Sequence, residues 1–163
     1  MTVLEFIDKY NKANSDKVKE QMLRSHIKRT YCPVLEKKYV LSMFIDGCVI
    51  DGYIDMVYSK INYTIALIKL YTDLDIDRDS NNKSMNVEIY DSLTNNNLVE
   101  SICEYIGVNE IKELSNINML LIQDYNDRNN SIVSMIKEFI KNIQNVTSVI
   151  NNIESIGDIV GKQ

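Results

Sequence analysis

The sequence contains no tryptophan, one proline, one histidine and five glycines among its 163 residues. With His26 as its only imidazole, the chain cannot form a metal site that needs several histidines. It contains no glycine-rich phosphate loop, no G-x-S-x-G nucleophile turn and no H-E-x-x-H motif. Since these catalytic signatures are missing, we expect the protein not to be an enzyme and to hold no cofactor.

A secretory leader and a membrane-spanning stretch are missing as well. The first eight residues lack a basic region followed by an apolar run. The most apolar stretch, residues 54–71, is interrupted by two lysines, an aspartate and an asparagine, which a lipid-facing helix does not readily tolerate. The cysteines are odd in number and widely spaced, at Cys32, Cys48 and Cys103, which is typical of free thiols in a reducing compartment. We therefore expect a cytoplasmic protein without membrane insertion.

Alanine is also scarce, although it is the best helix former, and occurs only at Ala13 and Ala66. Asparagine, isoleucine, lysine and tyrosine are abundant instead, which indicates the codon bias of an AT-rich genome, such as a low-GC bacterium or its phage. The apolar content of 45% and the charged content of 25% are those of a globular protein. We expect one domain over residues 1–156 and a frayed tail over 157–163.

Helical periodicity dominates the chain and predicts an all-α, single-domain multi-helix bundle. Thr2 with Glu5 forms a capping box for a first helix that ends near Asn14, and Ser15 can cap a second. Pro33 suits the first turn of a third helix, which runs to about Ile45 with Gly47 as its C-cap.

Five further helical segments follow a short link at Asp51 and Gly52, and the last of them, after the one that begins at Asn109, contains Ile132 to Ile153. Residues 54–71 carry the broad isoleucine stripe of a buried central helix, in which Ile54, Val57, Ile61, Ile65 and Ile68 lie on one side. Residues 73–86 have little periodicity and predict a loop. Later helices are expected over 87–93, over 97–107 with Asn97 and Glu100 as a second capping box, and from Asn109 onward.

The last helix has the clearest pattern in the chain, a heptad seam whose apolar residues alternate at spacings of four and three. The heptad seam consists of Ile132, Ile136, Phe139, Ile143, Val146, Ile150 and Ile153. Val133, Ile140, Val149 and Ile156 lie beside it and make it broader than one neighbouring helix requires. It is either the core face of a bundle helix or a contact with another subunit.

Residues 77–88 have the spacing of an EF-hand calcium loop, with oxygen ligands at Asp77, Asp79, Asn81 and Glu88. The sixth position is Asn82 rather than glycine, and the eighth position is a serine where a short strand residue is expected. A solvated loop remains the simpler interpretation, and we expect no high-affinity calcium site.

Charge is unevenly distributed along the chain. Residues 16–38 contain seven basic and three acidic residues, a net charge of +4, whereas the remainder contains 11 basic and 20 acidic residues, a net charge of −9. A patch around Arg29, Lys37 and Lys38 can contact another protein, whereas the pI of about 4.9 disfavours a nucleic-acid partner. His26 and Cys32 could form a catalytic pair, although a partly buried histidine beside the core is the simpler interpretation.

Three short segments carry a resemblance to a known group of proteins: residues 29–37 (RTYCPVLEK), 71–74 (YTDL) and 90–93 (YDSL). This pattern resembles small helical proteins of tailed phages and of prophages in low-GC Gram-positive bacteria, over about residues 1–125. The resemblance implies a phage protein that acts in the host cytoplasm, or within the virion, by binding phage or host proteins.

Two functions follow from that resemblance. The first is a virion or assembly component of the head, neck or tail, which could form homo-oligomers. Its tentative interaction residues are Arg29, Lys37, Lys38, Val149 and Ile156. The alternative is a small inhibitor that binds a host defence complex. A concentrated acidic face would favour the inhibitor, but the acidic residues are spread widely, so we favour the first function.

Overall fold

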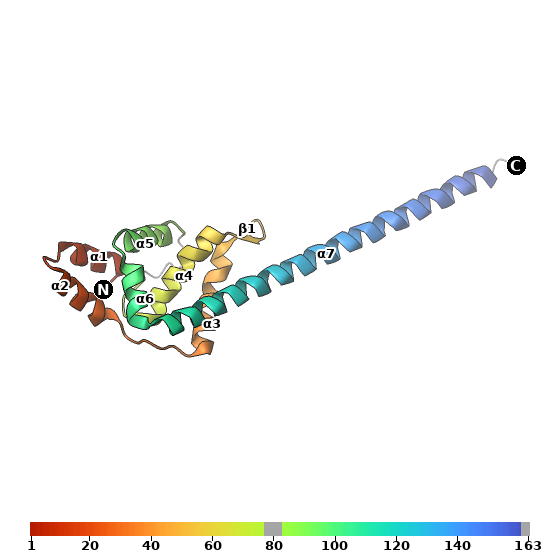
Figure 1. Ribbon diagram of the computed structural model, residues 1–163. Helices are drawn as coiled ribbons and strands as arrows, with labels where there is room; N and C mark the ends of the chain where they lie inside the picture. Colours follow the sequence, from red (N-terminus) through yellow and green to blue (C-terminus); the bar gives the residue numbers. More distant parts are fainter. Residues whose placement is uncertain (77–82, 161–163) are drawn as a thin grey trace. The chain divides into compact units, whose positions relative to one another are not determined.

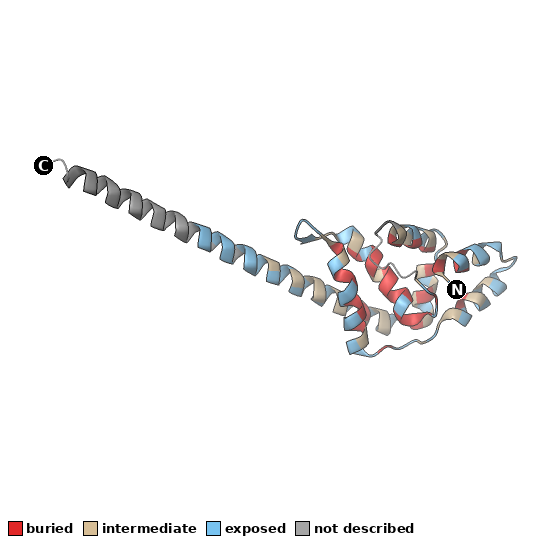
Figure 2. Ribbon diagram, turned by 180° about the vertical axis from the view of Figure 1, so that it is seen from behind, coloured by how far each residue is buried: buried red, intermediate tan, exposed pale blue. Residues whose placement is uncertain are grey.

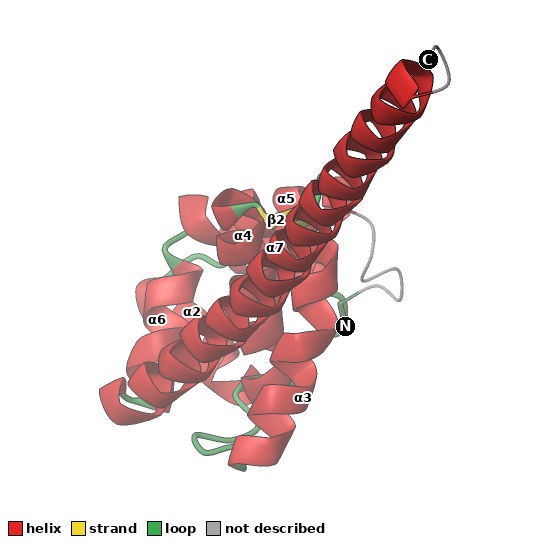
Figure 3. Cartoon of the chain, turned by 90° about the vertical axis from the view of Figure 1, so that its right-hand side faces the viewer, coloured by secondary structure: helices red, strands yellow, loops and turns green. Residues whose placement is uncertain are grey.

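The computed structural model describes residues 1–76 and 83–160, and for residues 83, 84, 134, 138 and 141–160 it describes the backbone alone. The chain divides into two compact units, Met1–Gln123 and Asp124–Gln163. Almost all of the described backbone is helical (Figure 1 and Figure 3), which confirms the predicted all-α class with a long C-terminal helix. None of the described helices is both long and apolar enough to cross a membrane.

The first two helices begin at the predicted caps. Helix α1 spans Val3–Lys12, and the Thr2 hydroxyl accepts a hydrogen bond from the Glu5 N–H at 3.2 Å while the Glu5 carboxylate accepts one from the Thr2 N–H at 2.9 Å. Helix α2 spans Asp16–His26, and the hydroxyl of Ser15 accepts a bond from the Val18 N–H. Both predicted caps are therefore confirmed.

Helix α3 spans Val34–Ile45 and is preceded by Pro33, as predicted, but Gly47 is not its C-cap. The helix passes instead into a 3-10 turn, η1, over Asp46–Cys48, and Gly47 lacks the positive φ of a C-cap glycine. Gly47 serves another purpose, because a Cβ atom there would lie 3.3 Å from the side-chain amide of Asn62. That amide donates to the Phe44 carbonyl at 3.0 Å, so the glycine leaves room for a buried helix-to-helix bond.

The link predicted around Asp51 and Gly52 is a two-residue β-hairpin turn. Strand β1, Val49–Ile50, pairs with the antiparallel strand β2, Tyr53–Ile54. Asp51 has a φ of 51° and Gly52 a φ of 83°, and positive values at both central residues are typical of the type I′ turn that joins twisted strands.

Helix α4, Met56–Tyr71, is the buried centre of the first unit, as predicted. Ile61, Ile65 and Ile68 are buried within the core, and the helix packs against α3 and α5. Val57, which we placed on the same stripe, is 69% exposed because burial begins only after the first turn, at Ser59. Figure 2 shows the buried residues concentrated in the helices of this unit.

Helix α5 spans Lys83–Asn95 and is longer than predicted, while α6 spans Leu98–Ile106 and ends at Gly107 as predicted. The expected capping box of Asn97 and Glu100 does not form. Asn97 has a left-handed backbone with a φ of 53° and makes no side-chain cap bond. Its N–H donates to the Thr94 carbonyl at 3.0 Å and its carbonyl accepts from the Ser101 N–H at 3.2 Å, so the backbone of Asn97 joins the end of α5 to the start of α6 without a side-chain cap.

Helix α7 is one continuous helix over Val108–Val160, where the sequence suggested two successive helical segments. Its first part belongs to the first unit, in which Leu114 is buried in the core. The described residues of the second unit form helix alone. Part of the predicted tail, residues 161–163, lies outside the described residues.

Candidate functional site

The described residues give little support to the proposed calcium loop. Asp77, Asp79 and Asn81 lie outside the described residues, and Glu88 is exposed on α5. Lys83, which would be the seventh loop residue, is already the first residue of α5. A calcium loop uses the backbone carbonyl of that position as a ligand, whereas in a helix this carbonyl accepts an intrahelical bond. No group of three or more metal-ligating side chains occurs among the described residues.

The geometry also disfavours a nucleophilic pair of His26 and Cys32. The Nδ1 atom of His26 lies 2.6 Å from the Asp73 carboxylate, and its ring packs edge-on against Phe6. Cys32 is buried, and burial raises the pKa of its thiol to about 11. At neutral pH this thiol is protonated and therefore a weak nucleophile. The histidine is partly buried beside the core residue Phe6, as the simpler interpretation expects, and its contact with Asp73 links α2 to the segment after α4.

Two residues of the basic segment stabilise the C-terminal end of α4. The Arg29 Nε donates to the Leu70 carbonyl at 2.6 Å, and the Lys28 Nζ donates to the Lys69 carbonyl at 2.9 Å. The carbonyls in the last turn of a helix have no partners within it and carry partial negative charge, which favours cations there. The Arg29 guanidinium also holds Glu36 through two bonds and keeps the pKa of that carboxyl below its usual range.

Lys37 lies in the interior, although we grouped it with Lys38 as an interaction residue. Its side chain is completely buried, and its ammonium pairs with Glu110 at 2.9 Å and with Glu113. Glu110 also accepts bonds from the Tyr71 hydroxyl at 2.7 Å and the Cys32 N–H at 2.8 Å. Lys37 therefore joins α3 to α7 inside the first unit and is not available to a partner at the surface.

Burial and ion pairing shift the pKa values of Lys37 and Glu110 in opposite directions. Burial alone would lower the pKa of Lys37, but bonds to Glu113 and Glu110 outweigh it, so that pKa is raised. Burial would likewise raise the pKa of Glu110, but Lys37, Tyr71 and Cys32 together lower it. Both shifts favour the charged forms at neutral pH.

The outer face of α3 presents apolar and aromatic side chains to solvent. Leu35 is 80% exposed, and Tyr39 and Met43 follow it at intervals of four residues on the same helix face. Lys38 is exposed beside Tyr39 in sequence, so of the three basic interaction residues it is the one whose side chain is exposed. We call Leu35, Lys38, Tyr39 and Met43 the α3 surface.

A second apolar surface lies on α7 within the second unit. Six apolar side chains between residues 132 and 140 are exposed, with Met135 at 68% and Phe139 at 65%. Figure 2 shows a stretch of exposed residues along this helix. We call this set the α7 stripe: Ile132, Val133, Met135, Ile136, Phe139 and Ile140. Val149 and Ile156 lie farther along the same helix, where the side chains are outside the described residues. The α7 stripe contains the first three residues of the heptad seam.

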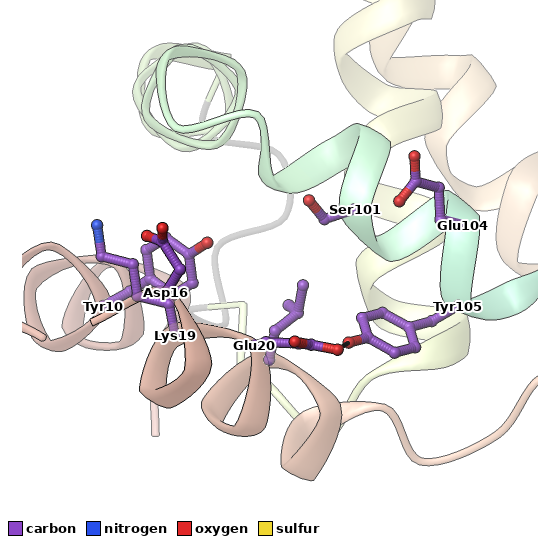
Figure 4. A pocket seen from close by; sticks show the side chains of 8 residues that line it. Tyr10, Asp16, Lys19, Glu20, Ser101, Glu104 and Tyr105 are labelled. Carbon is purple, nitrogen blue, oxygen red and sulfur yellow. Dashed lines mark hydrogen bonds between the residues drawn. The ribbon is translucent and has the colours of Figure 1, made fainter.

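A pocket of about 500 Å³ lies between α1, α2 and α6, and Figure 4 shows the side chains that line it. Two contacts join side chains that line it. The Tyr105 hydroxyl donates to Glu20 at 3.2 Å, and the Lys19 ammonium lies 5.4 Å from the centre of the Tyr10 ring. These contacts hold α6 and α1 against α2, so we assign this pocket no ligand.

The comparisons with known proteins give no match: no family model, no curated protein and no solved structure is significantly similar to this chain. The functional argument therefore depends on the surfaces described above.

Proposed function

We propose that this chain is a non-enzymatic phage protein that works by binding other proteins, as a component of the head, neck or tail or of their assembly. The observation that carries the proposal is the α7 stripe. Isolated apolar residues are common on protein surfaces, but contiguous apolar patches indicate interaction sites. Burying these six side chains against a partner removes from water the apolar area that drives association.

The phage origin is supported by the resemblance of residues 29–37, 71–74 and 90–93 and by the codon bias of the sequence. Under this proposal the protein accumulates in the host bacterial cytoplasm and enters the particle during assembly. Contacts between unlike surfaces of successive subunits tend to close into rings, which suits neck and tail structures.

Mass spectrometry of purified particles and assembly intermediates tests this proposal. We expect the wild-type chain and a variant with Asn130→Asp to be incorporated, and a variant with Ile136→Asp to be depleted. Residue 130 is exposed on α7 but is not part of the α7 stripe, so Asn130→Asp controls for the effect of an added negative charge on this helix.

Complete absence of the protein from particles and intermediates would contradict the virion proposal. An affinity purification of the full chain from infected cells would then distinguish the alternative. Recovery of a host defence complex, lost with Ile136→Asp and retained with Asn130→Asp, would identify the protein as an inhibitor.

A further inference from the structure

Each heptad of α7 between residues 129 and 156 holds three apolar residues, and taken together these residues fall at four of the seven heptad positions. When the heptad seam is assigned to positions a and d, Ile136, Ile143 and Ile150 fall at a. Position d holds Ile132, Phe139, Val146 and Ile153. The neighbouring positions e and g hold Val133, Met135, Ile140, Val149 and Ile156. An apolar surface of this width exceeds what the facing helix of a two-stranded coiled coil covers.

Charge is excluded from this surface over residues 129–153, which Arg128 at position g precedes and Glu154 at position e follows. Between residues 129 and 153 the only charged side chains are Lys137, Glu138 and Lys141, and these occupy positions b, c and f on the opposite side of the helix. Copies of the same helix can therefore approach one another along a, d, e and g without bringing like charges together. The second unit contains four basic and five acidic residues over 124–163, so its net charge of −1 opposes self-association only weakly.

The repeat itself identifies the kind of partner. An apolar spacing of 3.5 residues matches another helix with the same spacing, because each side chain then enters a hole between four residues of its neighbour. A second copy of α7 has the same apolar spacing, the same length and the same uncharged surface over residues 129–153. Within the second unit, Met135 and Phe139 are exposed, so the helix leaves the described part of this surface open to a partner.

The residue types at a and d determine how many copies fit. Two-stranded coiled coils favour β-branched residues at a with leucine at d, whereas β-branched residues at both positions favour three or four strands. Position a holds isoleucine in three successive heptads, and position d holds three β-branched residues, one phenylalanine and no leucine. A third or fourth helix also covers positions e and g, which a dimer leaves largely in water.

We propose that α7 forms a closed, parallel bundle of at least three copies of this chain, with residues 132–153 at its centre. This inference rests on the proposed function and adds to it the identity and number of the partners. Copies related by a single rotation axis have helices that run in the same direction, and three identical chains can close only around such an axis.

Native mass spectrometry of the full chain counts the copies directly. We expect a species of at least three times 18.9 kDa, about 57 kDa, and no stable dimer. The variant Ile140→Asp places a charge at position e, and we expect it to shift the population to monomer. The matched variant Asn130→Asp places its charge at position b, and we expect it to form an oligomer of the same size as the wild type. Circular dichroism of each variant checks that the helix content is retained.

A dimer as the largest species would overturn the bundle while leaving association through α7 intact. An Ile140→Asp variant that stays folded and keeps the wild-type mass would also overturn it, because position e would then not be buried. A chain that remains monomeric refutes self-association, and the particle analysis then decides separately whether the protein is a virion component.

Discussion

Replacing Lys37 by methionine should cost the first unit a large part of its stability. Methionine keeps most of the apolar stem but removes the ammonium, so Glu110 and Glu113 lose their buried counter-charge. Removing one partner of a buried ion pair costs about 3–5 kcal/mol. Two features favour the lower end of that range. Glu113 is 43% exposed and can be hydrated, and Tyr71 and the Cys32 N–H still donate to Glu110.

We therefore expect Lys37→Met to lower the free energy of unfolding by about 3 kcal/mol. Urea unfolding followed by far-ultraviolet circular dichroism measures this difference. The matched variant Glu113→Gln should cost about 1 kcal/mol or less, because a half-exposed ion pair contributes little. Adding Glu110→Gln to Lys37→Met should restore part of the lost stability, since the double variant leaves no charge buried alone. A loss below about 1 kcal/mol for Lys37→Met would refute the reasoning about this cluster.

Four other predictions follow from local contacts. The pKa of Glu110 is lowered in the folded chain, so its charged form contributes to the stability of the fold above pH 4.5. That stability is lost as the pH falls through the pKa of the folded chain, so the urea midpoint should decline in acid, and less steeply in the Glu110→Gln variant. Thr2→Ala should cost about 1 kcal/mol in thermal or urea unfolding, whereas Asn97→Gly should be neutral or stabilising, because Asn97 makes no cap bond and has a positive φ. Cys32 should react with a thiol reagent at pH 8 only after urea unfolding, and rapid labelling of the native chain would contradict its burial. Calorimetric titration should show no micromolar calcium binding, and a site abolished by Glu88→Gln would prove the loop functional.

Local signals explain which parts of the fold were predictable. The capping box of α1 lies within four consecutive residues, and the isoleucine spacing of α4 repeats over several turns, so both were predicted. The hairpin was missed because each of its strands has only two residues, too few for an alternating pattern. The Asp51–Gly52 dipeptide was the signal that could have identified it.

The buried cluster around Lys37 could not be predicted from local sequence. Its carboxylate partner Glu113 lies 76 residues away along the chain, and a lysine beside Lys38 on a helix gives no sign that one side chain is buried and the other exposed. The α7 stripe, in contrast, was predicted as a pattern because heptad spacing is visible in the sequence. The sequence left open whether the seam was internal, and within the second unit its first three residues are exposed.

Sedimentation velocity over a dilution series tests most directly whether the α7 stripe is an interaction surface. The full-length chain should sediment faster as its concentration rises, and Asn130→Asp should behave in the same way. Ile136→Asp should sediment as a monomer at every concentration, with the helix content of the wild type. If the wild-type chain sediments as a monomer throughout the series, or if Ile136→Asp associates as strongly as the wild type, association through the α7 stripe is contradicted.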